Sequence, residues 1–207
     1  MLCAIIGDAL GNFSALDAVL GAVEEAGILT ILQTGDVAVG PEPDACIRRL
    51  REAGARCVQG NTDRILVRFN RKRTSLASRL DEAEYAALAD ASDRISSVGL
   101  EWIAALPKVL RAEVDGIAML LCHGAPDGGT ETLDEGVAAQ RLARYREEVL
   151  CALVATGGPA APFHRWVADT LFVHPGPVAV AAGIAQYAVV DTDTQPWSVG
   201  SVQVRYA

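Results

Sequence analysis

Short apolar runs alternate with amphipathic segments along most of the chain. The apolar run at residues 2–7 is followed by residues 12–26, where Phe13, Leu16 and Leu20 share one helical face, and then by the apolar run ILTILQTG. This order predicts a strand, a helix and a second strand. The alternation continues with a helix in PDACIRRLREAG and with strands in RCVQG, IAMLLC, CALVAT and TLFVH.

Two regions depart from this alternation. Residues 64 to about 106 lack strand character and predict an inserted helical element, with helices at 76–91 and 99–106 and Pro107 ending the second. Near the end of the chain, AQYAVVDT and SVGSVQVRY predict two antiparallel strands. No repeat or flexible linker divides the sequence. The pattern therefore predicts one α/β domain over residues 1–207, with a mixed sheet system.

The composition supports a single buried core. The chain has 207 residues, of which 51% are apolar, and this is enough for one sizeable core. The first residues lack the cationic segment and the apolar run that are typical of a secretory signal peptide, and no later apolar segment is long enough to span a membrane. A cytoplasmic location is therefore expected. The five cysteines are odd in number and form no CxxC pair, which argues against a disulfide framework or a structural zinc site.

The charge narrows the choice of partners. A formal net charge of −8 opposes binding to nucleic acid, and neither nucleic acid nor a membrane is expected as a partner. One basic cluster, RFNRKR, contains Arg68, Arg71, Lys72 and Arg73, with Arg64 just upstream. It is either a solvated helical face or a site for a phosphate group. A phosphate-containing small molecule and a homo-oligomer both stay open.

Polar residues follow four of the predicted strands. Asp8, Asp36, Asn61 and His123 each come directly after an apolar run or one short turn later. In an open α/β sheet, ligands gather at the carboxyl ends of the strands. Asp and Asn beside Gly are also common turn residues, but His has no such preference. Carboxylates, an amide and an imidazole together suit Mn²⁺, Fe or Zn²⁺.

The order of these motifs resembles the calcineurin-like metallophosphoesterases, in particular their small bacterial and archaeal phosphodiesterase branch. The resemblance runs from Leu2 to about Tyr187 and is carried by GDALGN, TGD followed by VGPEPD, GNTD, LEWIAALP, CHGAP, GGPAAPF and VHPGPV. It implies a four-layer α-β-β-α sandwich in which two mixed β-sheets are flanked by helices. It also implies a dinuclear metal centre at the strand ends.

The resemblance assigns metal ligands position by position. Asp8, Asp36, Asn61 and His123 match the family's ligands, and Asp36 matches the aspartate that bridges the two ions. One ion would keep Asp36, Asn61 and His123, while the other would keep only Asp8 and Asp36. The expectation is one weakly bound divalent ion (Mn, Fe or Zn).

Four family histidines are replaced. Leu10, Gly158 and Ala160 stand where the family has metal-binding imidazoles, and Thr62 stands where it has its catalytic histidine. The catalytic residue is therefore unknown, because a hydroxyl whose proton is tightly held near pH 7 does not replace an imidazole. The small or apolar replacements are expected if a vacated cleft has been filled.

Two histidines near these motifs could substitute for the missing imidazoles, and one further acidic residue lies beside Thr62. His174 takes the place of a family Asn and is either a stand-in ligand or a loop histidine bonded to backbone. His164 is expected at the surface beside Arg165, and Asp63 is expected to brace its turn.

Three functions fit these observations. The preferred hypothesis is a phosphoesterase-fold protein with a degenerate metal site, catalytically impaired or inactive, that acts by binding a ligand or partner. The alternative is an active phosphomono- or diesterase with a single Mn, Fe or Zn ion. A third hypothesis, that GDALGN is a phosphate-cradling glycine loop, is disfavoured because its spacing fits neither GxGxxG nor a P-loop.

Overall fold

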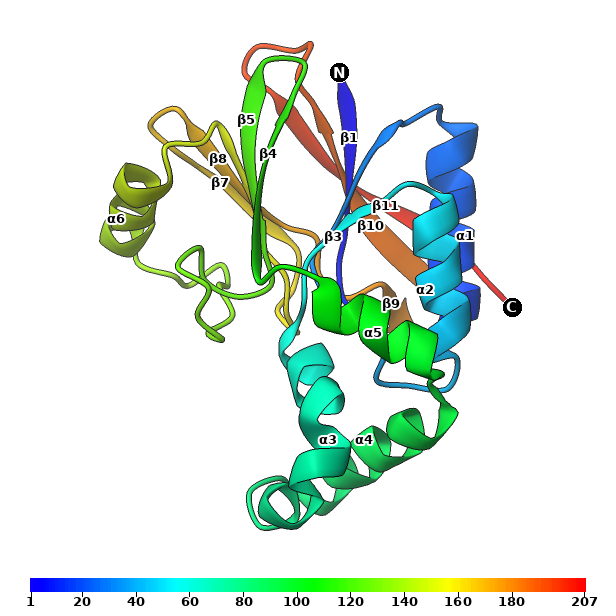
Figure 1. The fold of residues 1–207 in the computed structure, drawn as a ribbon. Coiled ribbons are helices and arrows are strands. Elements are labelled where there is room, and N and C mark those ends of the chain that lie inside the picture. Colours follow the sequence, from blue (N-terminus) through cyan, green and yellow to red (C-terminus); the bar gives the residue numbers. More distant parts are fainter.

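The computed structural model describes residues 1–207 and contains two β-sheets packed face to face (Figure 1). The first sheet has the strand order β11-β10-β1-β2-β3, and β9 pairs with β10. Its strands are β1 (Leu2–Ile6), β2 (Thr30–Gln33), β3 (Arg56–Cys57), β9 (Ala179–Ala181), β10 (Ile184–Asp191) and β11 (Ser198–Arg205). β1, β2 and β3 are parallel, and β10 runs antiparallel to β1, so the sheet is mixed.

The second sheet has the strand order β4-β5-β6-β8-β7. Its strands are β4 (Val109–Val114), β5 (Ile117–Cys122), β6 (Leu153–Ala155), β7 (Phe163–Val167) and β8 (Thr170–His174). The three central strands are parallel, and the two edge strands are antiparallel to their neighbours. The carboxyl ends of β5, β6 and β8 therefore share one edge of the sheet.

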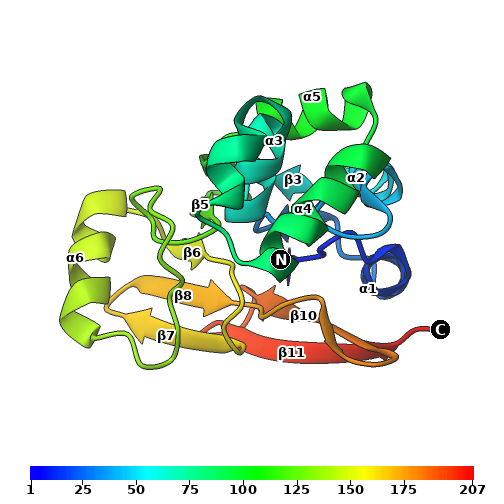
Figure 2. The same ribbon diagram turned by 90° about the horizontal axis from the view of Figure 1, so that it is seen from below.

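Helices cover the outer faces of both sheets. Figure 2 shows α6 on one side of the sheets and α1 and α2 on the other, with α3, α4 and α5 as a group at one edge. The helices are α1 (Phe13–Glu25), α2 (Pro43–Glu52), α3 (Asn61–Ala77), α4 (Glu82–Arg94), α5 (Ser97–Ala105) and α6 (Ala139–Val149). This is the expected four-layer α-β-β-α arrangement.

Three apolar clusters fill the spaces between the layers, and β1 shows how strand alternation divides them. Cys3 and Ile5 point between the two sheets, whereas Ala4 and Ile6 point toward the helices on the outer face of the first sheet. A third cluster joins the outer face of the second sheet to α6 through residues such as Phe172. Because β1 is buried on both faces, its sequence is continuously apolar.

The observed helices correct one predicted boundary. The expected helix at 76–91 is wrong, because α3 already occupies Asn61–Ala77 and the chain turns before α4 begins at Glu82. The break is set by Asp81, whose carboxylate accepts the Glu84 N–H at 2.8 Å while the Glu84 side chain accepts the Asp81 N–H. No helix combines the length and the apolar run that crossing a membrane requires.

Candidate functional site

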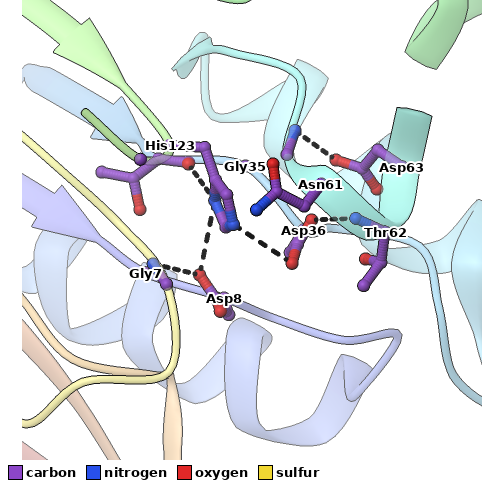
Figure 3. Close-up of polar contacts among 12 residues, drawn as sticks. Gly7, Asp8, Gly35, Asp36, Asn61, Thr62, Asp63 and His123 are labelled. Atoms are coloured by element: carbon purple, nitrogen blue, oxygen red, sulfur yellow. Dashed lines mark hydrogen bonds and ion pairs between the residues drawn. The ribbon is translucent and has the colours of Figure 1, made fainter. Parts of the chain in front are cut away.

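Three strand ends bring Asp8, Asp36 and His123 together at the meeting point of the two sheets (Figure 3). Asp8 follows β1 and Asp36 follows β2 in the first sheet, while His123 follows β5 in the second. One ligand atom from each lies within 4.8 Å of the other two, and all three side chains are buried. We call these three residues the acidic-imidazole cluster.

The imidazole of His123 is held between the two aspartates. Its Nε2 lies 3.2 Å from Oδ2 of Asp36, and its Nδ1 lies 3.8 Å from Oδ1 of Asp8. Nδ1 is also 2.8 Å from the carbonyl oxygen of Thr34, to which it donates when protonated. A metal-binding histidine is commonly oriented in this way, with one ring nitrogen on a carbonyl and the other facing the ion.

Close backbone packing holds Asp36 in its position. Its φ of +55° lies in the left-handed region, which aspartate tolerates better than most residues. Oδ1 accepts the N–H of Thr62 at 2.8 Å, at the start of α3. A Cβ on Gly60 would lie 2.0 Å from this oxygen, so the position requires glycine. The Gly-Asn-Thr-Asp segment is therefore fitted around the Asp36 carboxylate.

Asp63 stabilises the same turn through hydrogen bonds to its backbone. Its side chain is fully buried and accepts the N–H groups of Val37, Ala38 and Gly60 at 3.1 to 3.2 Å. Burial and the nearby Asp36 charge raise the pKa of Asp63 to about 6, and the three N–H groups lower it. The expected bracing role is confirmed by these contacts.

Charges within the cluster are strongly coupled. Burial disfavours the charged imidazole, but the hydrogen bond to Asp36 and the charges of Asp36 and Asp8 raise the pKa of His123 to about 9. Burial works against the charged form of Asp36 too, yet its bond to His123 keeps the pKa of that carboxyl below its usual value. Burial raises the pKa of Asp8 to about 7, against the attraction of His123. The imidazolium and the Asp36 carboxylate thus form a buried ion pair.

Asn61 lies beside the cluster, but its amide is engaged elsewhere. Its Nδ2 donates to the carbonyl oxygen of Thr130 at 3.0 Å, and its Oδ1 accepts a hydrogen bond from the Arg64 guanidinium. The oxygen expected to bind a metal is therefore occupied by a cation of the chain itself. In the sequence, Arg64 is part of the basic cluster, and Thr130 lies 69 residues from Asn61 in a loop. Neither position indicates a contact with the Asn61 amide.

Comparison with known proteins identifies the family. The calcineurin-like phosphoesterase superfamily domain matches residues 1–195. The chain belongs to this superfamily. Among curated proteins, none matches its sequence.

Three solved structures illustrate the shared superfamily fold. A hypothetical protein from Pyrococcus horikoshii OT3 superposes with a TM-score of 0.87 at 18% identity, covering 100% of this chain and 88% of that one. A metallophosphoesterase from Sphaerobacter thermophilus gives 0.74 at 22% identity, covering 100% and 90%. Vps29 from Entamoeba histolytica, complexed with Zn²⁺, gives 0.54 at 16% identity, covering 100% of both chains. At these identities the likeness establishes the fold alone.

None of the four positions expected to match family histidines supplies a side-chain nitrogen to the cluster. Gly158 offers only its backbone N–H, which donates to Oδ1 of Asp8 at 3.1 Å. Thr62 has a buried Oγ1 with no hydrogen-bond partner. Ala160 is half-buried in the loop after β6. Leu10 is 42% exposed, so the expectation that it fills a vacated cleft is wrong.

The loop at Gly158 is built around the absence of a side chain. Its φ is +115°, and a Cβ there would lie 2.6 Å from Oγ1 of Thr132. A larger residue would require both the backbone and Thr132 to move. The backbone conformation and the packing at position 158 therefore require glycine.

The remaining histidines lie outside the cluster. His174 is buried at the end of β8, stacks on Phe163 with ring centroids 5.7 Å apart, and accepts the Gly176 N–H at 3.0 Å. Its Nε2 has no partner, and burial lowers the pKa of His174 to about 4, so the ring is neutral near pH 7. His164 is exposed on β7.

The cluster has the chemistry for one divalent ion. It offers two carboxylates and one imidazole, a set that suits Mn²⁺, Fe or Zn²⁺. Three protein ligands with water in the open positions are common in metal sites that do chemistry. An ion at this place would replace the imidazolium proton as the positive charge between the aspartates.

Proposed function

We propose that this protein acts by binding a ligand or partner and has little or no phosphoesterase activity. In this proposal, Asp8, Asp36 and His123 hold at most one divalent cation, and they hold it weakly. The ligand of the protein is a phosphate-containing small molecule.

The observation that carries the proposal is the Gly158 contact. Where the superfamily motif supplies imidazoles, this chain supplies one backbone N–H, which is bonded to Asp8 at 3.1 Å. The Asn61 oxygen is bonded to Arg64, so it adds no ligand in this arrangement. Three ligands remain for a site that requires enough for two ions.

The expected loss of activity follows from the chemistry of two-metal hydrolysis. Such a site holds the attacking and the leaving oxygen between two ions and generates hydroxide near neutral pH. A general acid or base typically adds about 10² to 10⁴-fold, and the Thr62 hydroxyl does not ionise near neutral pH, so it cannot take this role. One weakly held ion without such a group lacks both contributions.

Metal analysis tests the metal content. The protein is purified without chelator, and Mn, Fe and Zn are measured per chain. We expect clearly less than one ion per chain. Two ions per chain would contradict the proposal.

Hydrolysis assays test the activity. Generic phosphomonoesters and phosphodiesters are incubated with the protein in excess Mn²⁺, beside an intact superfamily member. We expect turnover lower by about 10⁴-fold or more, because both an ion and an acid-base group are missing. Turnover within 10-fold of the intact enzyme would reject the proposal.

A second candidate is a single-metal phosphoesterase, and the orientation of His123 favours it. The contact of its Nδ1 with the Thr34 carbonyl leaves Nε2 facing the Asp36 carboxylate, as in a functional metal ligand. This candidate predicts one ion per chain and turnover that His123→Ala abolishes. His164→Ala, a change at an exposed histidine, is the matched control and keeps the activity.

A further inference from the structure

A basic groove runs along α3 from the edge of the cluster. It has a volume of about 440 Å³, and its lining includes Asn61, Arg64, Arg68, Lys72, Arg79 and Thr130. Four of these residues carry a positive charge, and none carries a negative charge. We call this feature the α3 groove. Its inner end lies at Asn61, one residue before Thr62, whose N–H binds Asp36.

The positive charges face one way because of their spacing. Arg64 and Arg68 lie four residues apart, which places them on one side of α3. The helix kinks at Lys72, whose φ of −126° is not helical, and Lys72 lines the same groove about 12 Å farther along the chain from Arg64. The neighbouring Arg73 turns away, because it pairs with Asp93 at 3.3 Å and its guanidinium lies 5.1 Å from the ring centroid of Phe69. Of the basic cluster in the sequence, Arg64, Arg68 and Lys72 line the groove, whereas Arg71 and Arg73 do not.

The groove charges have no acidic partner. Every ion pair of the protein involves other residues, although the chain has 26 Asp and Glu residues against 18 Lys and Arg. Like charges four residues apart on a helix repel each other. Four cations line one hollow whose lining contains no acidic residue, and this concentration of positive charge favours an anionic ligand.

We propose that the α3 groove binds a small molecule that carries two or more phosphate groups. Arginine guanidinium groups bind phosphate oxygens through paired hydrogen bonds, and lysine adds a point charge. A volume of about 440 Å³ lies within the range of small-molecule sites and is far larger than one phosphate needs. Cations spread over about two helical turns match phosphates at more than one place in one ligand. The net charge of −8 for the whole chain discourages long polyanions.

The inference deepens the proposed function, since it names the ligand class of a protein proposed to act by binding. It does not need a metal ion, because the groove cations contact the phosphates directly. Binding measured in chelator therefore tests the groove alone. Turnover and metal content test the proposed function separately.

The probe is inorganic tripolyphosphate, titrated by calorimetry into the full chain in EDTA at low and moderate salt. We expect saturable binding that is at least about 10-fold tighter than that of orthophosphate and that weakens as salt rises. Arg68→Glu should weaken binding about 10-fold or more, because a charge-assisted contact is replaced by repulsion. Arg71→Glu is the matched control: it lies on the same helix, is exposed, makes the same change in net charge and does not line the groove.

Several results would overturn the inference. These are no binding of tripolyphosphate at millimolar concentration, equal affinity for orthophosphate, or equal weakening by Arg68→Glu and Arg71→Glu. Tighter binding of a single-stranded oligonucleotide at the same phosphate concentration would also overturn it and assign the groove to nucleic acid. Circular dichroism melting curves confirm that both variants fold.

Discussion

Nε2 of His123 lies 3.2 Å from Oδ2 of Asp36, and this contact joins the two sheets at their carboxyl ends. His123 comes from β5 in the second sheet, and Asp36 follows β2 in the first. Both side chains are buried, so little solvent screens the pair. Removing one partner of this pair would therefore leave a buried charge without compensation.

Replacing His123 should destabilise the protein strongly. His123→Ala leaves the buried Asp36 and Asp8 carboxylates facing each other without a cation. Breaking a buried pair by removing one partner costs about 3–5 kcal/mol. We expect this decrease in the free energy of unfolding, measured by urea denaturation at pH 7 in EDTA.

The control for this change is His164→Ala. His164 is exposed on β7, and its replacement should change the free energy of unfolding by less than about 0.5 kcal/mol. A cost below about 1 kcal/mol for His123→Ala would show that the pair is not a stabilising element.

His174 should make the protein sensitive to acid. Its folded-state pKa is lowered to about 4, so between pH 6.5 and 4 the unfolded chain binds a proton that the folded protein excludes. The stability that depends on the neutral ring is present above pH 6.5 and is lost as the pH falls toward 4. A shift of this size corresponds to about 3 kcal/mol.

The His174→Asn variant isolates this effect, because asparagine keeps an acceptor for the Gly176 N–H and does not titrate. Urea denaturation from pH 7.5 to 4.5 should show wild type losing stability relative to the variant as the pH falls. Parallel pH profiles for the two proteins would be incompatible with a depressed His174 pKa.

The positions of Asp8, Asp36 and His123 at strand ends could be predicted from the sequence, because each residue follows an apolar run. LCAII, TILQ and IAMLLC form β1, β2 and β5, and parallel strands place their ends at one edge. By contrast, β4 has the sequence VLRAEV and is missing from the predicted strands, because two charged residues interrupt its apolar run. It is an edge strand with exposed side chains, so its sequence pattern is weak.

The surroundings of Asn61 could not be predicted. Its partner Thr130 lies 69 residues away, and the Arg64 guanidinium reaches back over one turn of α3. The sequence identifies each side chain, but it does not determine which of several possible partners hydrogen-bonds to the Asn61 amide. Tertiary contacts of this kind decide whether a motif residue is free to bind a metal.

Leu10→His tests whether the motif position still faces the metal site. Leu10 has a φ of +48°, a conformation that histidine accepts more readily than leucine, so the change should not destabilise the loop. A new imidazole beside Asp8 and Asp36 should raise Mn²⁺ affinity by about 10-fold or more. The affinity is measured by calorimetry at constant pH.

Leu29→His makes the identical substitution at a control position. Leu29 is 92% exposed and lies at the amino end of β2, whereas the cluster lies at the carboxyl ends of the strands. It should leave the Mn²⁺ affinity unchanged. If both variants bind Mn²⁺ as wild type does, the assignment of position 10 to the metal site is wrong. Gly158→His is unsuitable for this test, because its Cβ would collide with Thr132.

Asp63→Asn should show how strongly the turn beneath the site depends on a carboxylate. Oδ1 of Asp63 accepts from Val37 and Ala38, and Oδ2 accepts from Gly60. An amide supplies only one acceptor oxygen, so its NH₂ group would face an N–H donor inside the protein. Leaving a buried donor unsatisfied costs about 1–3 kcal/mol, which urea denaturation at pH 7 would measure.

Asp81→Asn is the matched control, since Asp81 is an exposed N-cap of α4 and asparagine caps helices equally well. The same chemical change should therefore have almost no effect there. If Asp63→Asn were as mild as Asp81→Asn, the turn would not depend on the negative charge of Asp63. A larger cost at Asp63 would explain why an acidic residue follows Gly60, Asn61 and Thr62, although it does not contact the cluster ligands through its own side chain.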